Sequence, residues 1–194
     1  NQLGRALSMS RNNIKIGVIL QGAETPFMKE VLKGIQEACA EVDNLGGTVL
    51  VHKIEHQNAE DVIFAMEKMR MEEVSGIAMV PLDEERVKRE IDRFVEEFRI
   101  PVVTFTSDVE DTKRLCFVGQ NGVQCGRAAA GLMGELIGGK GKVAVISGYS
   151  TNTSLSSRVV GFREEIARKY PGIEIIGPEY CFEENGRARE ITEG

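Results

Sequence analysis

The hydrophobic positions of this chain first form a clear pattern at residue 14. The run from Ile14 to Leu20 is mostly apolar or β-branched and predicts a strand buried on both faces. A helical period follows, in which every third or fourth residue is apolar. The residues that share this apolar face are Phe27, Val31, Ile35, Ala38 and Val42. Thr25 can cap the helix and Pro26 suits its first position, so the stretch predicts a strand, a short loop and a capped helix.

The same alternation continues to the end of the sequence. Further strands are expected at 48–51, 76–80, 100–105 and 114–118, with helices around 62–69 and 87–98 between them. Beyond Gly122 we expect a helix at 128–136, a strand at 142–147, a helix at 154–170, a strand at 173–176 and a last helix from near Glu183. Strands that alternate with helices over short connections predict an α/β fold with doubly wound parallel sheets.

The spacing of the strands predicts two lobes of unequal completeness. Five strands complete a first lobe over residues 13–120, whereas residues 121–194 supply only two strands and their helices. We therefore expect the second lobe to be partial, with apolar helix faces that lack part of their cover. Residues 1–12 precede the first strand and are expected to form a linker or a marginal helix.

Composition and charge exclude several classes of protein. The chain of 194 residues is 42% hydrophobic and 28% charged, an ordinary globular composition, and it has no apolar run long enough for a membrane helix. A net charge of −6 argues against a globally basic nucleic-acid binder, although residues 1–23 contain Arg5, Arg11 and Lys15 and no acid. The four cysteines form no C-x-x-C pair, which favours buried, reduced thiols.

No motif of an enzyme, a cofactor site or a metal site stands out. Neither G-x-G-x-x-G nor a Walker motif follows the first strand, and no G-x-S-x-G is present. His52 and His56 are four residues apart but have no third ligand nearby. We predict no catalytic activity, no cofactor and no metal, and keep a doubly wound enzyme such as an oxidoreductase as a distant alternative.

Polar and aromatic residues gather instead at the carboxyl ends of the predicted strands, where α/β folds bind ligands. These residues are Thr25, Phe27, Asp83, Thr106, Ser107, Asp108 and, in the helix after strand 142–147, Arg158. Guanidinium and carboxylate groups pair with vicinal hydroxyls, and an aromatic ring packs on the apolar face of a sugar. Other roles stay open, because Phe27 is equally suited to the core and both aspartates to capping turns.

Five motifs in order carry a resemblance over the chain from about residue 13. They read IGVILQGAETPFMKEVLKGIQEA, GIAMVPLD, IPVVTFTSD, LCFVGQNG-x-x-x-GR-x-x-A and SSRVVGF. The chain resembles the effector-binding domain of the lactose-repressor (LacI/GalR) family and its periplasmic sugar-binding relatives. The resemblance implies the type I periplasmic-binding-protein fold, with a small sugar or sugar-like effector in a cleft between two lobes that close on binding.

The resemblance also assigns roles to individual residues. The ligand-stacking phenylalanine of the family matches Phe27, and Met28 stands where a second aromatic is frequent. Its R-x-x-G-F arginine matches Arg158, and Phe182 matches a further aromatic of the cleft. The family aspartate after the fourth strand falls at Thr106, two residues before Asp108.

The first residues favour the regulator branch of this superfamily. Asn1–Leu7 resembles the N-x-x-A-R-x-L hinge helix that joins a repressor's DNA-binding headpiece to its effector domain, with Gly4 where Ala is usual. The resemblance makes Arg5 and Leu7 DNA contacts. This resemblance predicts a cytoplasmic, dimeric transcriptional regulator that binds operator DNA and has no membrane partner. The alternative is a solute-binding protein of a sugar transporter or the sensor domain of a membrane receptor.

Overall fold

The structure is a computed structural model that describes residues 14–21, 25–54 and 56–194. Within it the chain forms two compact units. Unit 1 runs to Phe105 and includes Glu110–Phe117, while unit 2 consists of Thr106–Val109 and Val118–Gly194. The predicted hinge residues Arg5 and Leu7 lie outside the described residues. The elements below are therefore described for each unit separately.

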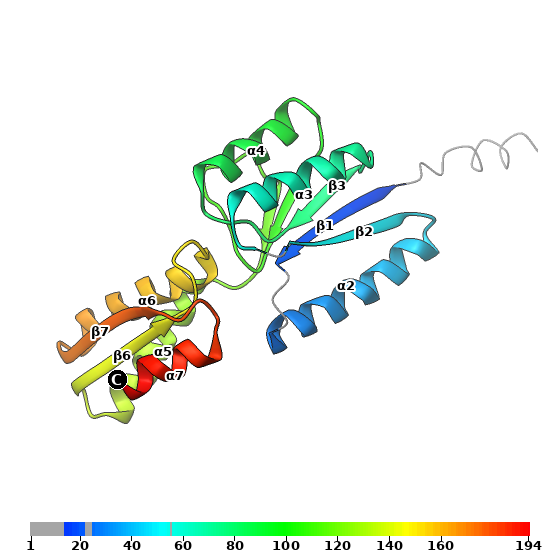
Figure 1. The fold of residues 1–194 in the computed structure, drawn as a ribbon. Coiled ribbons are helices and arrows are strands. Elements are labelled where there is room, and N and C mark those ends of the chain that lie inside the picture. The colour runs from blue at the N-terminus through cyan, green and yellow to red at the C-terminus, as the bar shows by residue number, and fades with distance from the viewer. Residues whose placement is uncertain (1–13, 22–24, 55) are drawn as a thin grey trace, which may run out of the picture. The chain divides into compact units, whose positions relative to one another are not determined.

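The predicted alternation of strands and helices is confirmed (Figure 1). In unit 1 the elements are β1 (Lys15–Gln21), α2 (Pro26–Asn44), β2 (Thr48–Ile54), α3 (Ala59–Met71), β3 (Gly76–Met79), α4 (Glu85–Glu96) and β4 (Val102–Phe105). The chain continues through β5 (Cys116–Val118), α5 (Gly122–Leu136), β6 (Lys140–Ser147), α6 (Thr153–Lys169), β7 (Gly172–Tyr180) and α7 (Asn185–Glu193).

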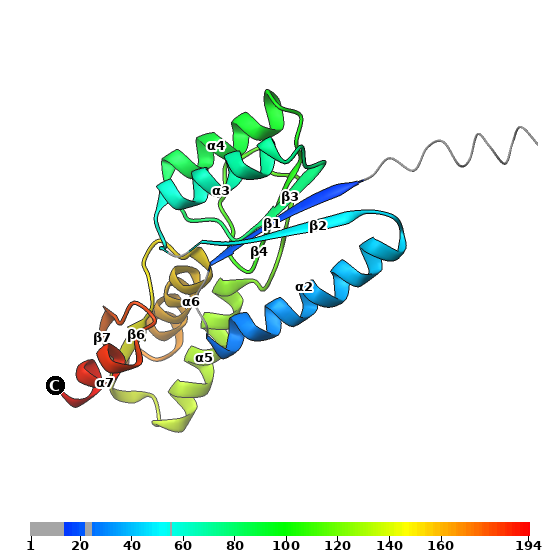
Figure 2. The same ribbon diagram turned by 45° about the vertical axis from the view of Figure 1, so that its right-hand side comes forward.

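Five strands form the sheet of unit 1 in the order β2-β1-β3-β4-β5. Strand β1 pairs in parallel with both β2 and β3, and β3 pairs in parallel with β4. Helix α2 covers one face of this sheet, and α3 and α4 cover the other (Figures 1 and 2). Both faces of β1 are therefore buried, which explains its continuous apolar run.

The side chains of β1 alternate between two packed layers. Val18 and Leu20 pack with Met28 of α2 and with Val80. A Cβ on Gly17 would lie 2.9 Å from the Met69 sulfur, so the opposite face of β1 lies directly against α3. Thus the core of unit 1 lies on both sides of the sheet.

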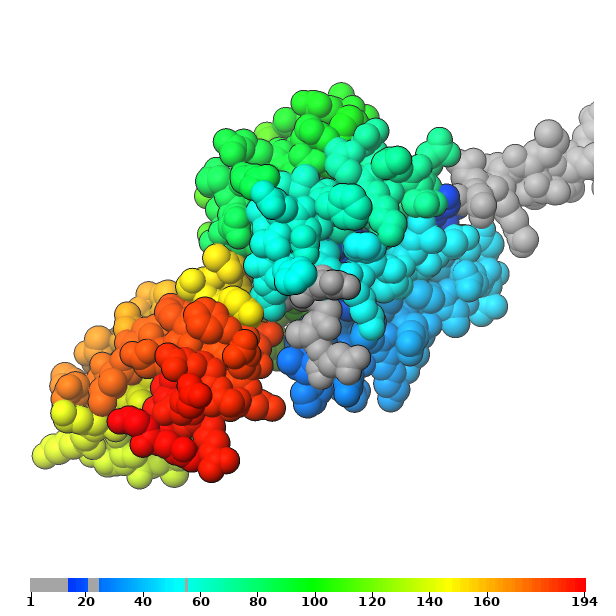
Figure 3. All heavy atoms as spheres, in the orientation of Figure 1, coloured from blue at the N-terminus to red at the C-terminus, as the bar shows by residue number. Residues whose placement is uncertain are grey.

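Unit 2 contains a sheet of two parallel strands, β6 and β7. Its buried cluster joins Ala130 of α5, Ile166 of α6 and the strand residues Val143 and Ile173. Helix α7, red in Figure 3, has no buried residue along its described length. The buried cluster covers one face of this sheet. On the opposite face, Ile146 of β6 and Ile176 of β7 are 38% and 47% exposed.

Two local expectations need correction. The apolar face of α2 includes Met28, which is 7% exposed, whereas Phe27 is 62% exposed and Ala38 is also at the surface. Successive helical residues point about 100° apart, so adjacent apolar residues cannot both face the sheet. The cysteines are not buried, since Cys116 is exposed and Cys39, Cys125 and Cys181 are partly exposed free thiols.

Candidate functional site

In unit 1 the predicted site residues follow the carboxyl ends of neighbouring parallel strands. Phe27 lies after β1 and is 62% exposed. It is therefore a surface aromatic residue and not part of the core. Asp83 lies after β3, and its Oδ1 is 2.8 Å from the Lys88 ammonium. This hydrogen bond raises the pKa of Lys88. The structure therefore offers an aromatic face and a paired carboxylate from this unit.

Thr25 and Met28 hold the first turn of α2 in place. The Thr25 hydroxyl accepts a hydrogen bond of 3.2 Å from the Met28 amide, as expected of an N-cap. The Met28 side chain packs into the core. Both residues thereby fix the position of Phe27, which lies between them in the sequence.

The segment Thr106–Val109 leaves the end of β4 and is fastened to the start of α6 in unit 2. Ser107, which is 1% exposed, donates a hydrogen bond of 2.8 Å to Asn152 Oδ1. The Asp108 amide donates to Thr153 Oγ1 at 2.9 Å, and the Thr153 hydroxyl donates back to the Asp108 carbonyl. Ser107 thus has a structural partner, and the main chain of Asp108 is held at a helix N-terminus.

Thr106 adopts the left-handed backbone conformation, with φ of 60°. A β-branched residue is rarely found there, because its side chain crowds the backbone. Its amide donates to the Val118 carbonyl at 3.1 Å, which ties the segment to the end of β5. Strained residues of this kind cluster at functional sites, but the strain alone names no ligand.

Arg158 of α6 donates three hydrogen bonds through its guanidinium group. Its Nη1 donates to the carbonyl and the hydroxyl of Ser154, both at 2.9 Å, and its Nη2 donates to Gln120 Oε1 at 3.1 Å. A guanidinium has five N–H donors in a fixed plane, and these bonds use three of them. The remaining two donors define a fork that is oriented before any ligand arrives.

A second aromatic site lies at the carboxyl ends of β6 and β7. Phe182 follows β7 and is 49% exposed, and its ring packs against Tyr149, which follows β6. Sequence reasoning singled out Phe182 but missed Tyr149. The available signal was its position, directly after the predicted strand 142–147, because parallel strands end at the same edge of their sheet.

Arg158 and Glu183 also line a cavity of about 470 Å³ within unit 2. Its apolar walls come from α5, β6 and α6, and include Met133, Val143 and Phe162. Pockets that bind small molecules have this character, with few polar groups on mostly apolar walls. Cys181 and Glu183, which follow β7, also line this cavity.

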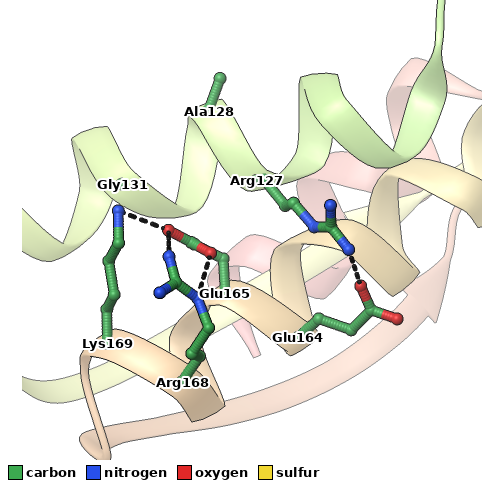
Figure 4. Close-up of a pocket in the computed structure, with 7 residues that line it drawn as sticks. All are labelled: Arg127, Ala128, Gly131, Glu164, Glu165, Arg168 and Lys169. Atoms are coloured by element: carbon green, nitrogen blue, oxygen red, sulfur yellow. Dashed lines mark hydrogen bonds and ion pairs between the residues drawn. The ribbon is translucent and has the colours of Figure 1, made fainter.

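A second cavity, of about 640 Å³, lies between α5 and α6 and is lined by charged groups (Figure 4). Arg127 pairs with Glu164 at 2.8 Å, and Glu165 pairs with Arg168 at 2.9 Å and with Lys169 at 2.7 Å. The hydrogen bond from Lys169 lowers the pKa of Glu165. Both carboxylates are paired with cations of the same two helices, so we assign this surface to the packing of α5 against α6.

The sequence matches the family described as periplasmic binding protein domain over residues 16–194. Together with the parallel sheets and the residues at their carboxyl ends, this match identifies the chain as a member of that family. Across the described residues, the structure contains no helix that is both long and apolar enough to span a membrane. No relative was found among curated protein sequences.

Several solved structures share this fold. An ABC transporter solute-binding protein from Burkholderia graminis, in complex with D-arabinose, is 26% identical with a TM-score of 0.84, covering 93% of this chain and 61% of its own. A solute-binding protein from Agrobacterium vitis with bound D-fucose is 25% identical with a TM-score of 0.83, covering 92% and 61%. A sugar-binding protein of a Bacillus halodurans sugar ABC transporter is 27% identical with a TM-score of 0.75, covering 93% and 61%. The chain thus spans about three fifths of these proteins.

Proposed function

We propose that this chain is the sugar-binding part of a solute-binding protein of a sugar transporter. The observation that carries the proposal is the guanidinium of Arg158, which Ser154 and Gln120 hold in one orientation near the carboxyl end of β6. A fixed fork of donors suits the adjacent hydroxyls of a sugar ring. The similar proteins from Burkholderia graminis and Agrobacterium vitis, solved with D-arabinose and D-fucose, support the same class of ligand.

The other residues complete the chemistry that a sugar needs. In this proposal Asp108 of unit 2 accepts hydrogen bonds from hydroxyl groups, and Thr106 offers a further hydroxyl. The exposed ring of Phe182 packs against the C–H face of the sugar, which removes apolar surface from water. Unit 1 offers groups of the same chemistry, namely the Asp83 carboxylate and the exposed ring of Phe27. No step of this binding requires a cofactor or a metal ion.

A thermal unfolding screen of the full-length protein tests the proposal. The panel contains D-arabinose, D-fucose, D-allose and other aldoses, with amino acids of similar size as the control. A ligand that binds only the folded state stabilises it by about 2.7 kcal/mol at a concentration of 100 times Kd. We expect at least one aldose to raise the unfolding temperature and the amino acids to leave it unchanged. If no aldose raises it, or only amino acids do, the proposal is wrong.

The sequence Asn1–Leu7 supports a second candidate, the effector-binding domain of a cytoplasmic, dimeric LacI-type regulator. In that protein Leu7 wedges between base steps in the minor groove while Arg5 meets a phosphate. The coding sequence on the 5′ side of the Asn1 codon distinguishes the candidates. A helix-turn-helix pattern there supports the regulator, whereas a secretion signal supports the transporter protein.

For the regulator, operator binding gives a quantitative test. Leu7→Ala is expected to weaken specific binding and to reduce the bending of the DNA. Arg5→Ala is expected to lower the slope of log affinity against log salt by about one, since one phosphate contact is lost. If neither substitution changes affinity, bend or salt slope, these residues form no hinge on DNA.

A further inference from the structure

The pairing of β6 and β7 continues past the ends of both strands. The Cys181 amide donates to the Ser147 carbonyl at 2.8 Å, and the Phe182 amide donates to the Gly148 carbonyl at 3.3 Å. These bonds bring the loop that follows β7 alongside the loop that follows β6. Tyr149 and Phe182, which are 33 positions apart in the sequence, meet as a result.

The two rings form an edge-to-face pair. Their centroids are 5.5 Å apart and their planes are inclined by 61°, which is a favourable geometry for aromatic rings. Phe182 keeps 49% of its surface exposed, while Tyr149 is more covered. Burial, aided by the charges of Glu183 and Glu184, raises the pKa of Tyr149, so its phenol stays a neutral hydroxyl. The more covered ring of Tyr149 therefore packs against the more exposed ring of Phe182.

The backbone at this position is unusual in a way that constrains Phe182. Phe182 and Glu183 both adopt the left-handed region, with φ of 53° and 61°, although neither is glycine. The turn is closed by a hydrogen bond of 2.9 Å from the Glu184 amide to the Cys181 carbonyl. Two consecutive residues remain in such a conformation only where their surroundings hold them. The ring of Tyr149 is one of those surroundings.

Close packing around Gly148 is a second contact that holds the turn at Phe182 and Glu183 in place. A Cβ on Gly148 would lie 2.8 Å from Leu155 Cδ1 and 3.0 Å from Glu183 Cγ. Because Gly148 has no side chain, Glu183 can approach the backbone that precedes Tyr149. The loop after β6 and the turn after β7 therefore form one packed unit, in which Phe182 keeps about half of its surface exposed.

We propose that Tyr149 is a positioning residue that holds the exposed ring of Phe182 as a platform for the apolar face of a bound sugar. This inference rests on the proposed function, because it assigns a role in sugar binding. Tyr149 acts through Phe182 and does not touch the sugar. The same contacts make a prediction that needs no ligand, namely that the two rings share one fixed arrangement in the free protein.

A double-mutant cycle on the full-length protein tests the proposal, with D-arabinose or another aldose that binds the wild type as the ligand. Tyr149→Ala should weaken sugar binding by roughly 3- to 10-fold, the size expected from the loss of one aromatic pair. Tyr149→Phe keeps the pair and should bind as the wild type does. In a Phe182→Ala background, Tyr149→Ala should cause no further loss, because the platform is already absent.

Three outcomes would overturn the proposal. Equal losses from Tyr149→Ala in both backgrounds would mean that Tyr149 contacts the sugar itself. A loss with Tyr149→Phe would assign the effect to the hydroxyl, and unchanged affinity in Tyr149→Ala would leave the residue without this role.

If the wild type binds no sugar, the proposed function fails. Near-UV circular dichroism then tests, without a ligand, whether the rings of Tyr149 and Phe182 are paired. The chain has no Trp and three Tyr, and Phe182→Ala keeps every tyrosine, so this variant should reduce the tyrosine signal by removing the partner of Tyr149. An unchanged signal in Phe182→Ala would contradict the pairing.

Discussion

Units 1 and 2 are built from the same alternation of strands and helices, but they bury their sheets differently. In unit 1 helices cover both faces of five strands, and Ile19 and Leu20 on opposite faces of β1 are 0% exposed. In unit 2 two strands are covered by α5 and α6 on one face, while Ile146 and Ile176 remain 38% and 47% exposed. A parallel sheet needs cover on both faces. The comparison shows that the same local pattern gives a closed core in one unit and an open one in the other.

The closed core of unit 1 predicts the largest loss of stability. Phe94 is 0% exposed and packs edge-to-face on Phe98. Phe94→Ala should lower the free energy of unfolding by about 3–5 kcal/mol, because the core cannot fill the cavity. Phe64 of α3 is 66% exposed and is the matched control, with an expected change within about 0.5 kcal/mol. Urea unfolding of both variants checks the contrast, and similar losses would mean that the core is not where the structure places it.

The backbones of α5 and α6 approach each other closely in unit 2. A Cβ on Gly161 would lie 2.0 Å from the Val123 carbonyl oxygen, so Gly161→Ala should push the helices apart and cost roughly 1–3 kcal/mol. Gly131 has nothing within 4 Å of an added Cβ, and Gly131→Ala should stabilise α5 by up to about 1 kcal/mol. Thermal unfolding of the two variants should therefore move in opposite directions. A neutral Gly161→Ala would mean that the helices are not in backbone contact.

Besides its open sheet face, unit 2 has exposed apolar residues on α5 that should make the 194-residue chain associate. Leu132 and Leu136 of α5 are 64% and 73% exposed and lie on one helix face beside the cavity wall of Met133. Exposed apolar patches drive association. Sedimentation of the chain should show aggregates or a broad unfolding transition, and the double variant Leu132→Lys, Leu136→Lys should reduce association. A monomeric wild-type chain with one sharp transition would show that unit 2 is self-sufficient.

The smallest expected effect concerns a buried carboxyl group in the well-packed unit. Glu90 of α4 is 8% exposed, and burial raises its pKa despite the opposing charge of Arg93. The folded state therefore holds this proton more tightly than the unfolded state. Protonated Glu90 therefore stabilises the folded state. This stabilisation is complete below the pKa of Glu90 in the unfolded chain and is lost as the pH rises through its pKa in the folded protein.

Glu90→Gln removes this dependence. The variant should gain stability relative to the wild type as the pH rises from the unfolded pKa of Glu90 through its raised folded pKa, and urea midpoints at several pH values measure the difference. Glu37→Gln, at an exposed position of α2, is the control for the substitution itself. If the stability of Glu90→Gln runs parallel to that of the wild type over this pH range, the carboxyl group is not perturbed by its burial.

The fold was predictable from the sequence because its signals are local. The apolar run of β1, the cap at Thr25 and the helical periods depend on neighbouring residues, and every strand and helix predicted from residue 14 onward is present. The orientation of α2 was harder, since Phe27 and Met28 are both apolar and only the sheet decides which of them faces inward. Local patterns carry no information about that choice.

The candidate site was predictable only where one residue carries its own signal. Arg158 stands out as a charge on a largely apolar helix face, and Phe182 as an aromatic ring after a strand. Their partners do not, because Gln120 is 38 positions from Arg158 and Tyr149 is 33 positions from Phe182. Likewise, the bond from Ser107 to Asn152 spans 45 positions. Such contacts depend on tertiary packing, which periodicity does not describe.

Calorimetric titration of Arg158→Ala tests the central claim most directly, namely that Arg158 recognises a sugar. The sugar is the aldose that stabilises the wild-type, full-length protein, and Arg163→Ala is the control, because Arg163 lies on the same helix and bonds to the Gly177 carbonyl. Losing a charged group that pairs with the ligand should cost about 2–5 kcal/mol, roughly a 30-fold or greater loss of affinity. Arg163→Ala should bind as the wild type does. Unchanged affinity in Arg158→Ala, or equal losses in both variants, would contradict the claim.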